Sequence, residues 1–285
     1  MKTTLLLLII FLSVELSFAQ EVNYYDSGKI KDSLVLQENG LSEYFKFSEN
    51  GNLFFHLKEI ITTNGQIVGK LKEYFIGSNM LHYEITVNKS LQNVGPVTAY
   101  YQNGEIEYKG SYDQNQNQTG DWFEYYENGN LLRHSIYKDN KIIYRKDGLP
   151  NGNVYLEMEL LEGKNLYRIT YYHSNGNIES IRYENLEGDL IGKHLEYREN
   201  GTQLYKTGQY NDKGEKSGEW ITYREDGAIW WSEKYLENGN IYCENFYENG
   251  KLKDQGERTY SGNKVGLWIY YDKDGNKINE ENFEE

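Results

Sequence analysis

The sequence predicts an all-β chain, an elongated single-layer antiparallel meander of about eleven β-hairpin repeats, each about 25 residues long. Three observations lead to this fold class. An aromatic residue, two further residues and then Asn-Gly or Asp-Gly recur along the chain. Short segments rich in aromatic residues alternate with turn residues, and no segment beyond the N-terminus has the 3.6-residue period of a helix. Two prolines in 285 residues leave a hydrogen-bonded ladder uninterrupted.

The repeat length follows from the positions of the turn dipeptides. From Asn103 onward they recur every 23 to 26 residues, once the divergent copy at Asn151-Gly152 is included. Less regular copies precede them at Asp26-Ser27-Gly28, Asn50-Gly51 and Gly77-Ser78. The repeat therefore covers nearly the whole chain. The Asn or Asp of the later turns stands at positions 103, 128, 151, 175, 200, 226, 249 and 274.

Each repeat is expected to be one hairpin with a type I′ turn, because Asn-Gly and Asp-Gly tolerate positive φ at both central residues. The strand before the turn carries Gly-x-Trp-x-x-Tyr, and the strand after it carries an aliphatic residue and then a tyrosine. Side chains alternate along a strand, so aromatic residues are expected on both faces of the sheet. The clearest copies are Gly120, Trp122 and Tyr125; Gly218, Trp220 and Tyr223; and Gly266, Trp268 and Tyr271.

The composition fits a thin sheet better than a compact globule. Hydrophobic residues make up 38% of the chain, but aromatic residues reach 15%, with 28 tyrosines. Flat rings bury a large area along their stems while their polar tips meet water. Repeats that contact only their neighbours form a quasi-one-dimensional protein, so we expect one repeat domain over residues 20–285.

These motifs resemble MORN-type repeats, in the bacterial variant of the YwqK-like antitoxin family. The resemblance covers nearly all of residues 20–285 and is clearest over 95–131 and 167–275. It implies successive β-hairpins in a single layer and a non-enzymatic role in protein binding, with membrane lipids also associated with the family. The antitoxin variant implies a toxin partner. Such repeats serve as scaffolds in unrelated settings, so the resemblance specifies the fold more closely than the function.

The first 19 residues are predicted to be a secretory signal peptide. Lys2 precedes an apolar run from Leu5 to Val14, and Ser17 and Ala19 place small residues at −3 and −1 of a cut before Gln20. The apolar run is short for a membrane span. The mature chain is therefore expected in a periplasm, outside the cell or on its surface, unlike a cytosolic antitoxin. The alternative is a buried first strand or a retained anchor.

The formal charge of −14, without a basic stripe, limits the classes of partner. Phosphate backbones and anionic lipid head groups should be repelled, so we expect neither nucleic acid binding nor direct binding to membrane lipid. A protein partner, including a basic toxin, or a neutral glycan is favoured. The alternative is that the charge only keeps an extended sheet soluble.

No catalytic residue, metal site or cofactor is predicted. The five histidines are scattered through different repeats, and Cys243 is the single cysteine. Because Cys243 stands where other repeats carry Trp, we expect a buried packing residue. Carboxylates such as Glu127, Glu199 and Glu225 recur once per repeat, which indicates a solvated edge. An enzyme would need a polar cluster confined to one repeat.

The leading hypothesis is an exported, non-enzymatic protein-binding scaffold or interaction module, and the alternative is an antitoxin or immunity-type protein that neutralises a toxin. Trp230 and Trp231 are expected to place one indole on each face of the sheet. The alternative for all the aromatic candidates is that they are rungs of the internal ladder. The candidate binding surface comprises Trp122, Trp220, Trp230, Trp231, Trp268, Tyr126 and Tyr247.

Overall fold

The computed structural model describes residues 18–37, 40–61 and 65–284. Residues 1–17 of the predicted signal peptide lie outside the described residues, while Phe18 and Ala19 belong to the first strand. The described residues divide into two compact units, which we treat separately. The first runs to residue 143 and includes 148–152, and the second comprises 144–147 and the residues from 153 onward.

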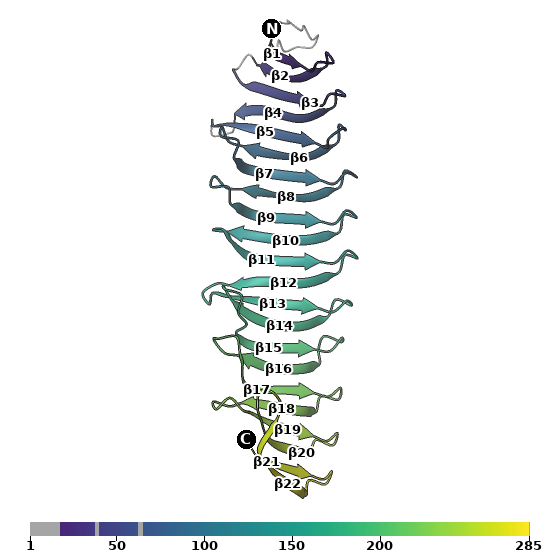
Figure 1. The fold of residues 1–285 in the computed structure, drawn as a ribbon, viewed down its shortest axis with the longest axis vertical. Helices are drawn as coiled ribbons and strands as arrows, with labels where there is room; N and C mark the ends of the chain where they lie inside the picture. Colours follow the sequence, from purple (N-terminus) through teal and green to yellow (C-terminus); the bar gives the residue numbers. More distant parts are fainter. Residues whose placement is uncertain (1–17, 38–39, 62–64, 285) are drawn as a thin grey trace. The chain divides into compact units, whose positions relative to one another are not determined.

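The first unit is an antiparallel meander in which each strand pairs with its neighbours in sequence (Figure 1). Its strands are β1 (Phe18–Tyr24), β2 (Ile30–Leu36), β3 (Ser42–Phe47), β4 (Leu53–Ile61), β5 (Ile67–Tyr74), β6 (Leu81–Val87), β7 (Asn93–Tyr100), β8 (Ile106–Tyr112), β9 (Gln118–Tyr125) and β10 (Leu131–Lys138). β11 (Lys141–Gly148) contains residues of both units.

The second unit repeats the same pairing pattern along its own strands. These are β12 (Val154–Leu161), β13 (Leu166–Tyr172), β14 (Ile178–Asn185), β15 (Gly192–Tyr197), β16 (Leu204–Tyr210), β17 (Lys216–Tyr223), β18 (Ile229–Tyr235), β19 (Ile241–Phe246), β20 (Leu252–Arg258), β21 (Lys264–Tyr271) and β22 (Lys277–Phe283).

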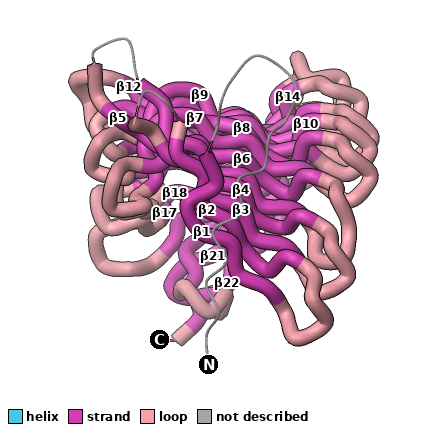
Figure 2. The backbone as a smooth tube through the Cα atoms, turned by 90° about the horizontal axis from the view of Figure 1, so that it is seen from above, coloured by secondary structure: helices cyan, strands magenta, loops and turns pink. Residues whose placement is uncertain are grey.

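The predicted all-β, single-layer meander of repeated hairpins is confirmed. Figure 2 shows turns and loops at the ends of the strands and no helix in the described chain. The divergent turns at Gly28 and Gly51 close hairpins of the same kind as most of the later ones, and the turn at Gly77 closes a hairpin whose loop is one residue longer. No described helix is long and apolar enough to cross a membrane.

Most of these turns are hairpin loops of three residues rather than the type I′ turns that the sequence suggested, and the turns at Gly77 and Asn200 have loops of four residues. Gly104 N–H donates to the Tyr101 carbonyl (3.0 Å), and Tyr101 N–H donates to the Glu105 carbonyl (2.8 Å). Gly104 has φ +87°, while Asn103 is not among the residues with positive φ. The type I′ prediction is wrong because this loop is a type I turn followed by one left-handed glycine, which needs positive φ only once.

The asparagine stabilises this loop with its side chain rather than with its backbone conformation. Asn103 Oδ1 accepts a hydrogen bond from Glu105 N–H (2.9 Å), which is the local bond of an Asx turn. Its Nδ2 donates to the Glu127 carbonyl (3.0 Å) in the next hairpin turn. One amide therefore closes its own turn and joins it to the following repeat. Asn128, Asn175 and Asn249 make the same pair of bonds.

A second side chain reaches the next repeat from the first residue of the turn. Tyr101 Oη donates to the Tyr125 carbonyl (2.6 Å), and Tyr247 Oη donates to the Tyr271 carbonyl (2.8 Å). We call these contacts and the asparagine contacts the clasps, and the edge that carries them the clasp edge. Tyr25, Tyr126, His173, Arg198 and Arg224 also bond a carbonyl one repeat further on.

Turns at the opposite edge close on themselves. Asp113 Oδ1 accepts hydrogen bonds from Asn115 N–H (2.8 Å) and Asn117 N–H (2.9 Å). Asn88, Asn185 and Asn211 make the equivalent pair of local bonds. The two edges of each unit therefore differ, because the clasp edge is cross-linked from repeat to repeat.

The clasp-edge hairpins from β1–β2 to β9–β10 and from β13–β14 to β21–β22 also contain a β-bulge soon after the turn. In the β17–β18 hairpin Tyr223 pairs with Ile229 and Thr222 pairs with Trp231, so Trp230 is the extra residue. The bulge recurs one repeat earlier at Tyr205 and one repeat later at Lys253. A bulge bends its strand and redirects the neighbouring side chains. Strict alternation of faces therefore fails at this position.

Replacing Asn103 tests the clasp. Asn103→Asp keeps the acceptor for Glu105 N–H but removes the donor to the Glu127 carbonyl, whereas Asn103→Ala removes both bonds. Each bond is worth about 1 kcal/mol, so urea unfolding should rank the free energy of unfolding as native, then Asp, then Ala. Equal stability of the native chain and Asn103→Asp would show that the bond to the next repeat contributes nothing.

Candidate binding surface

Three of the predicted surface tryptophans lie inside the ladder. Trp122, Trp220 and Trp268 are 5%, 2% and 4% exposed. Each ring lies over a glycine of the preceding strand, because a Cβ added at Gly208 would stand 2.1 Å from Trp220 Cδ2. Gly110 and Gly256 have the same relation to Trp122 and Trp268. These indoles occupy space that only a glycine leaves open.

Polar contacts complete the burial of each of these rings. Trp220 Nε1 donates to the Gln209 carbonyl (3.1 Å), and the Lys216 ammonium lies 4.6 Å from the ring centroid. Burial lowers the pKa of Lys216, and the nearby Lys206 lowers it further. Lys264 lies 4.2 Å from the centroid of Trp268 in the same way. The Trp220 and Trp268 indoles are thus covered by a glycine strand and a lysine, Trp122 packs against tyrosines, and all three are rungs of the ladder.

Tyr126 and Tyr247, the two tyrosines of the predicted surface, are both clasp residues. Their hydroxyl groups bond the carbonyls of Gly148 and Tyr271. Trp230 and Trp231 differ from the other predicted residues. Their ring centroids are 4.6 Å apart at an interplanar angle of 66°, so the two indoles touch. The expectation of one indole on each face is wrong, because the bulge at Trp230 interrupts the alternation.

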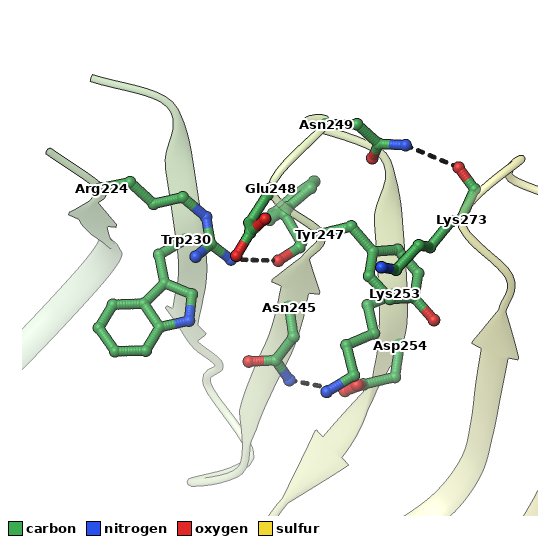
Figure 3. Close-up of a pocket in the computed structure, with 10 residues that line it drawn as sticks. Arg224, Trp230, Asn245, Tyr247, Glu248, Asn249, Lys253, Asp254 and Lys273 are labelled. Atoms are coloured by element: carbon green, nitrogen blue, oxygen red, sulfur yellow. Dashed lines mark hydrogen bonds between the residues drawn. The ribbon is translucent and has the colours of Figure 1, made fainter. Parts of the chain in front are cut away.

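Trp230 is the predicted residue that lies open to solvent, with 44% of its surface exposed. It lines a groove of about 490 Å³ together with Tyr247, so the structure brings two of the predicted residues together (Figure 3). The other predicted residues do not line this groove, and whether any of them binds a ligand stays a prediction. The sequence did not indicate the remaining side chains of the groove, which include Arg224, Asn245, Lys253, Asp254 and Lys273.

Hydrogen bonds hold the wall of this groove in place. Asn245 Nδ2 donates to Asp254 Oδ1 (2.6 Å), and Arg224 donates to the Phe246 carbonyl (2.7 Å). Asn249 Nδ2 donates to the Lys273 carbonyl (2.7 Å), a contact visible in Figure 3. The polar lining is therefore organised without a ligand. These residues occupy turn and bulge positions of neighbouring repeats, which is the sequence signal that could have grouped them.

A ladder of carboxylates forms the second candidate surface. Glu199, Glu225 and Glu248 precede the Asn or Asp of three successive turns on the clasp edge of the second unit, and all three are exposed. The carbonyl of Glu199 accepts Asn175 Nδ2 (2.8 Å), and that of Glu225 accepts the Gln203 amide. Successive turns are two strands apart, so the carboxylates recur about every 10 Å.

Cys243 is buried, as its place in the repeat predicted. Burial raises the pKa of its thiol. The position twelve residues before the Trp slot is glycine in the repeats of Trp122, Trp220 and Trp268, but it is Trp231 in this repeat. The large and the small residue are therefore exchanged between the two strands. Neither residue suggests a reactive site.

One polar cluster joins the strands β11, β12 and β13. Glu157 accepts hydrogen bonds from Tyr172 Oη (2.6 Å) and Tyr144 Oη (3.3 Å), and it pairs with Lys146 (3.2 Å). Burial opposes ionisation of Glu157, but the bonds from Tyr172 and Lys146 lower its pKa overall. Burial and Glu157 raise the pKa of Tyr172. The cluster therefore offers neither a protonated carboxyl nor a phenolate near neutral pH. Among the described residues, no group of His, Cys, Asp and Glu is placed to hold a metal ion.

Comparison with known families supports a MORN-type repeat protein. Residues 93–114 and 118–139 match the family model of the MORN repeat variant. These segments contain the β7–β8 and β9–β10 hairpins with their turns at Gly104 and Gly129. MORN repeats suggest a repeat-based protein-binding module. No curated protein matches the chain.

Solved structures with some likeness add no argument about function. A crystal structure of TcdB2-TccC3-TEV is 12% identical over 93% of this chain and 16% of that chain, with a TM-score of 0.22. A porin-like protein from Bacteroides uniformis ATCC 8492 is 10% identical over 83% of this chain and 91% of that chain, with a TM-score of 0.16. The chain spans less than a fifth of the TcdB2-TccC3 structures that it matches.

Replacing Gly208 tests the packing of the tryptophan rungs. Gly208→Ala would put a methyl group into the Trp220 ring, and overpacking of this kind should lower the free energy of unfolding by about 1–3 kcal/mol. Urea unfolding measures the change.

The matched background for that measurement is Trp220→His, because His194 fills the same slot in another repeat. Gly208→Ala should cost much less in this background, since the smaller ring leaves room for the methyl group. An equal cost in both backgrounds would mean that the glycine is not there to admit the indole.

Proposed function

We propose that the chain is an exported, non-enzymatic protein-binding module that engages a basic partner through the clasp edge of its second unit. The carboxylate ladder of Glu199, Glu225 and Glu248 carries this proposal. A run of exposed acids on successive turns costs stability through mutual repulsion, and a basic surface would relieve that cost. The MORN-type repeats support a binding module rather than an enzyme.

The structure of the turns suits such a role. The clasps fix the backbone of Glu199 and Glu225 to the preceding repeat, so the carboxylates stand on an ordered edge. Ordered groups lose little conformational freedom on binding. The net charge of −14 would also speed the approach of a basic protein.

Export is the second part of the proposal, supported by the apolar run and the small residues before Gln20. Phe18 and Ala19 pair with Leu36 and Val35 at the start of β1. A cut before Gln20 removes only these two residues from the strand and leaves the pairing of Glu21 with Leu34 intact. Signal cleavage is thus compatible with the first hairpin. A periplasmic or cell-surface location follows from this proposal.

Toxin neutralisation is a narrower form of the same proposal. A basic toxin is one partner that the acidic edge would suit, and the resemblance to YwqK-like antitoxins points in the same direction. Its distinguishing property is that the captured partner should arrest growth when it is expressed without this chain. A partner without that property would leave a general scaffold role.

Affinity capture tests the proposal. The full chain with a C-terminal tag is expressed and recovered from the cell envelope, where mass spectrometry should find Gln20 as its first residue. The native chain should retain a basic protein that Glu199→Lys/Glu225→Lys retains at least about tenfold less, because the charge reversal repels it. Immunoblotting of the captured protein gives the ratio.

Glu187→Lys/Glu237→Lys is the matched control, because both residues are exposed in turns of the opposite edge and the charge change is identical. It should retain the partner. Equal loss of the partner in both variants would show that net charge alone governs binding. Equal retention in both would show that the carboxylate ladder is not part of the binding site.

A further inference from the structure

The groove beside Trp230 departs from the repeat pattern in one respect. The bulge residue is Tyr205 one repeat earlier, Lys253 one repeat later and Ile278 in the repeat after that. Of these four repeats, the Trp230 repeat alone has an indole at the bulge. Trp230 does not lie over a strand glycine as the buried indoles do. With 44% of its surface exposed, the ring keeps apolar area open to a ligand in the groove.

Two neighbours hold the Trp230 ring in place. The Trp231 ring meets it edge to face, and the Arg224 guanidinium carbon lies 5.5 Å from its centroid. Arg224 is itself fixed by its clasp to the Phe246 carbonyl. The indole is therefore a preorganised platform, which lowers the entropic cost of placing a ligand against it.

The polar side of the groove carries both signs of charge. Lys253, Lys273 and Glu248 line it, and none of the three makes an ion pair within the described chain. Arg224 and Asp254 bring the total to three cations and two carboxylates. A strongly anionic ligand would approach against the net charge of −14, and a cationic ligand would meet three positive groups beside the ring.

A neutral ligand rich in hydroxyl groups matches this lining best. Each hydroxyl both donates and accepts, so it can bond an ammonium group and a carboxylate in turn. The C–H face of a sugar ring is apolar and flat enough to lie on an indole. The volume of about 490 Å³ falls within the usual range of small-ligand sites, roughly 300–1,000 Å³.

We propose that this groove binds a neutral oligosaccharide, with a sugar ring on Trp230 and hydroxyl groups bonded to Lys253, Asp254 and Lys273. The groove shares only Glu248 with the carboxylate ladder of the proposed protein-binding function, because the carboxylates of Glu199 and Glu225 do not line it. Glu199→Lys/Glu225→Lys should therefore keep the oligosaccharide affinity, so the two proposals fail independently.

Isothermal titration calorimetry of the full chain tests the site. The probes are cellohexaose, maltohexaose, mannohexaose and chitohexaose at millimolar concentration, with hexagalacturonate as the charged comparison. At least one neutral probe should bind, and Trp230→Ala should weaken it about tenfold or more. Trp230→Phe should recover part of the loss, because it restores a ring. Binding should change little between low and high salt, because no net charge pairs with the ligand.

Tyr205→Ala is the matched control, since Tyr205 fills the same bulge slot one repeat earlier and its ring lies 5.2 Å from the Arg198 guanidinium. The Tyr205→Ala variant should bind the oligosaccharide with the affinity of the native chain. Near-ultraviolet circular dichroism checks the fold of each variant. Lys253→Met removes a groove ammonium without an ion pair and gives a second test that spares the ring.

Three results would overturn the proposal. The first is that no neutral probe binds. The second is that hexagalacturonate binds more tightly than the neutral probes and with strong salt dependence. The third is that Trp230→Ala and Lys253→Met bind the neutral probe as tightly as Tyr205→Ala does.

Discussion

Each hairpin of this protein has a single layer of sheet and must therefore be held by its neighbours in sequence. The clasps meet that requirement at one edge, where Tyr101 and Asn103 bond backbone carbonyls of the next turn. A half-buried carbonyl without a partner is costly, so the bond from Tyr101 also satisfies the Tyr125 carbonyl. The stability of such an array is a sum over neighbouring repeats. Two strands and two turns make up the repeat of about 25 residues, and each clasp joins one turn to the next.

Packing across the strands obeys a volume rule that complements the clasps. Trp122, Trp220 and Trp268 occupy the space over a glycine, and Cys243 stands in a repeat where Trp231 takes the glycine position. Large and small residues alternate between adjacent strands because a single layer offers no other space for an indole. The buried core combines these indoles with aliphatic side chains such as Leu71, Ile85 and Val97.

The fold could be predicted because its signals are local and repeated. The Asn-Gly dipeptides located the turns, and the positions of Gly28, Gly51 and Gly77 were found from divergent copies. The turn type was not predictable from the dipeptide alone. The Asn103 side chain stabilises the observed conformation by bonding both its own turn and the Glu127 carbonyl of the next turn. The contact between Trp230 and Trp231 was missed for a related reason: a bulge has no residue signature, yet it reverses the face of the next side chain. The groove was missed because its residues come from three successive turns.

Hydrogen exchange of Tyr101→Phe tests the dependence on neighbouring repeats most directly. The substitution removes only the hydroxyl that bonds the Tyr125 carbonyl. Loss of this clasp should speed amide exchange in the β7–β8 and β9–β10 hairpins, because each repeat is stabilised only by its neighbours. Exchange in β3 to β5 should not change. Unchanged protection throughout the first unit, or a uniform loss across it, would contradict the account.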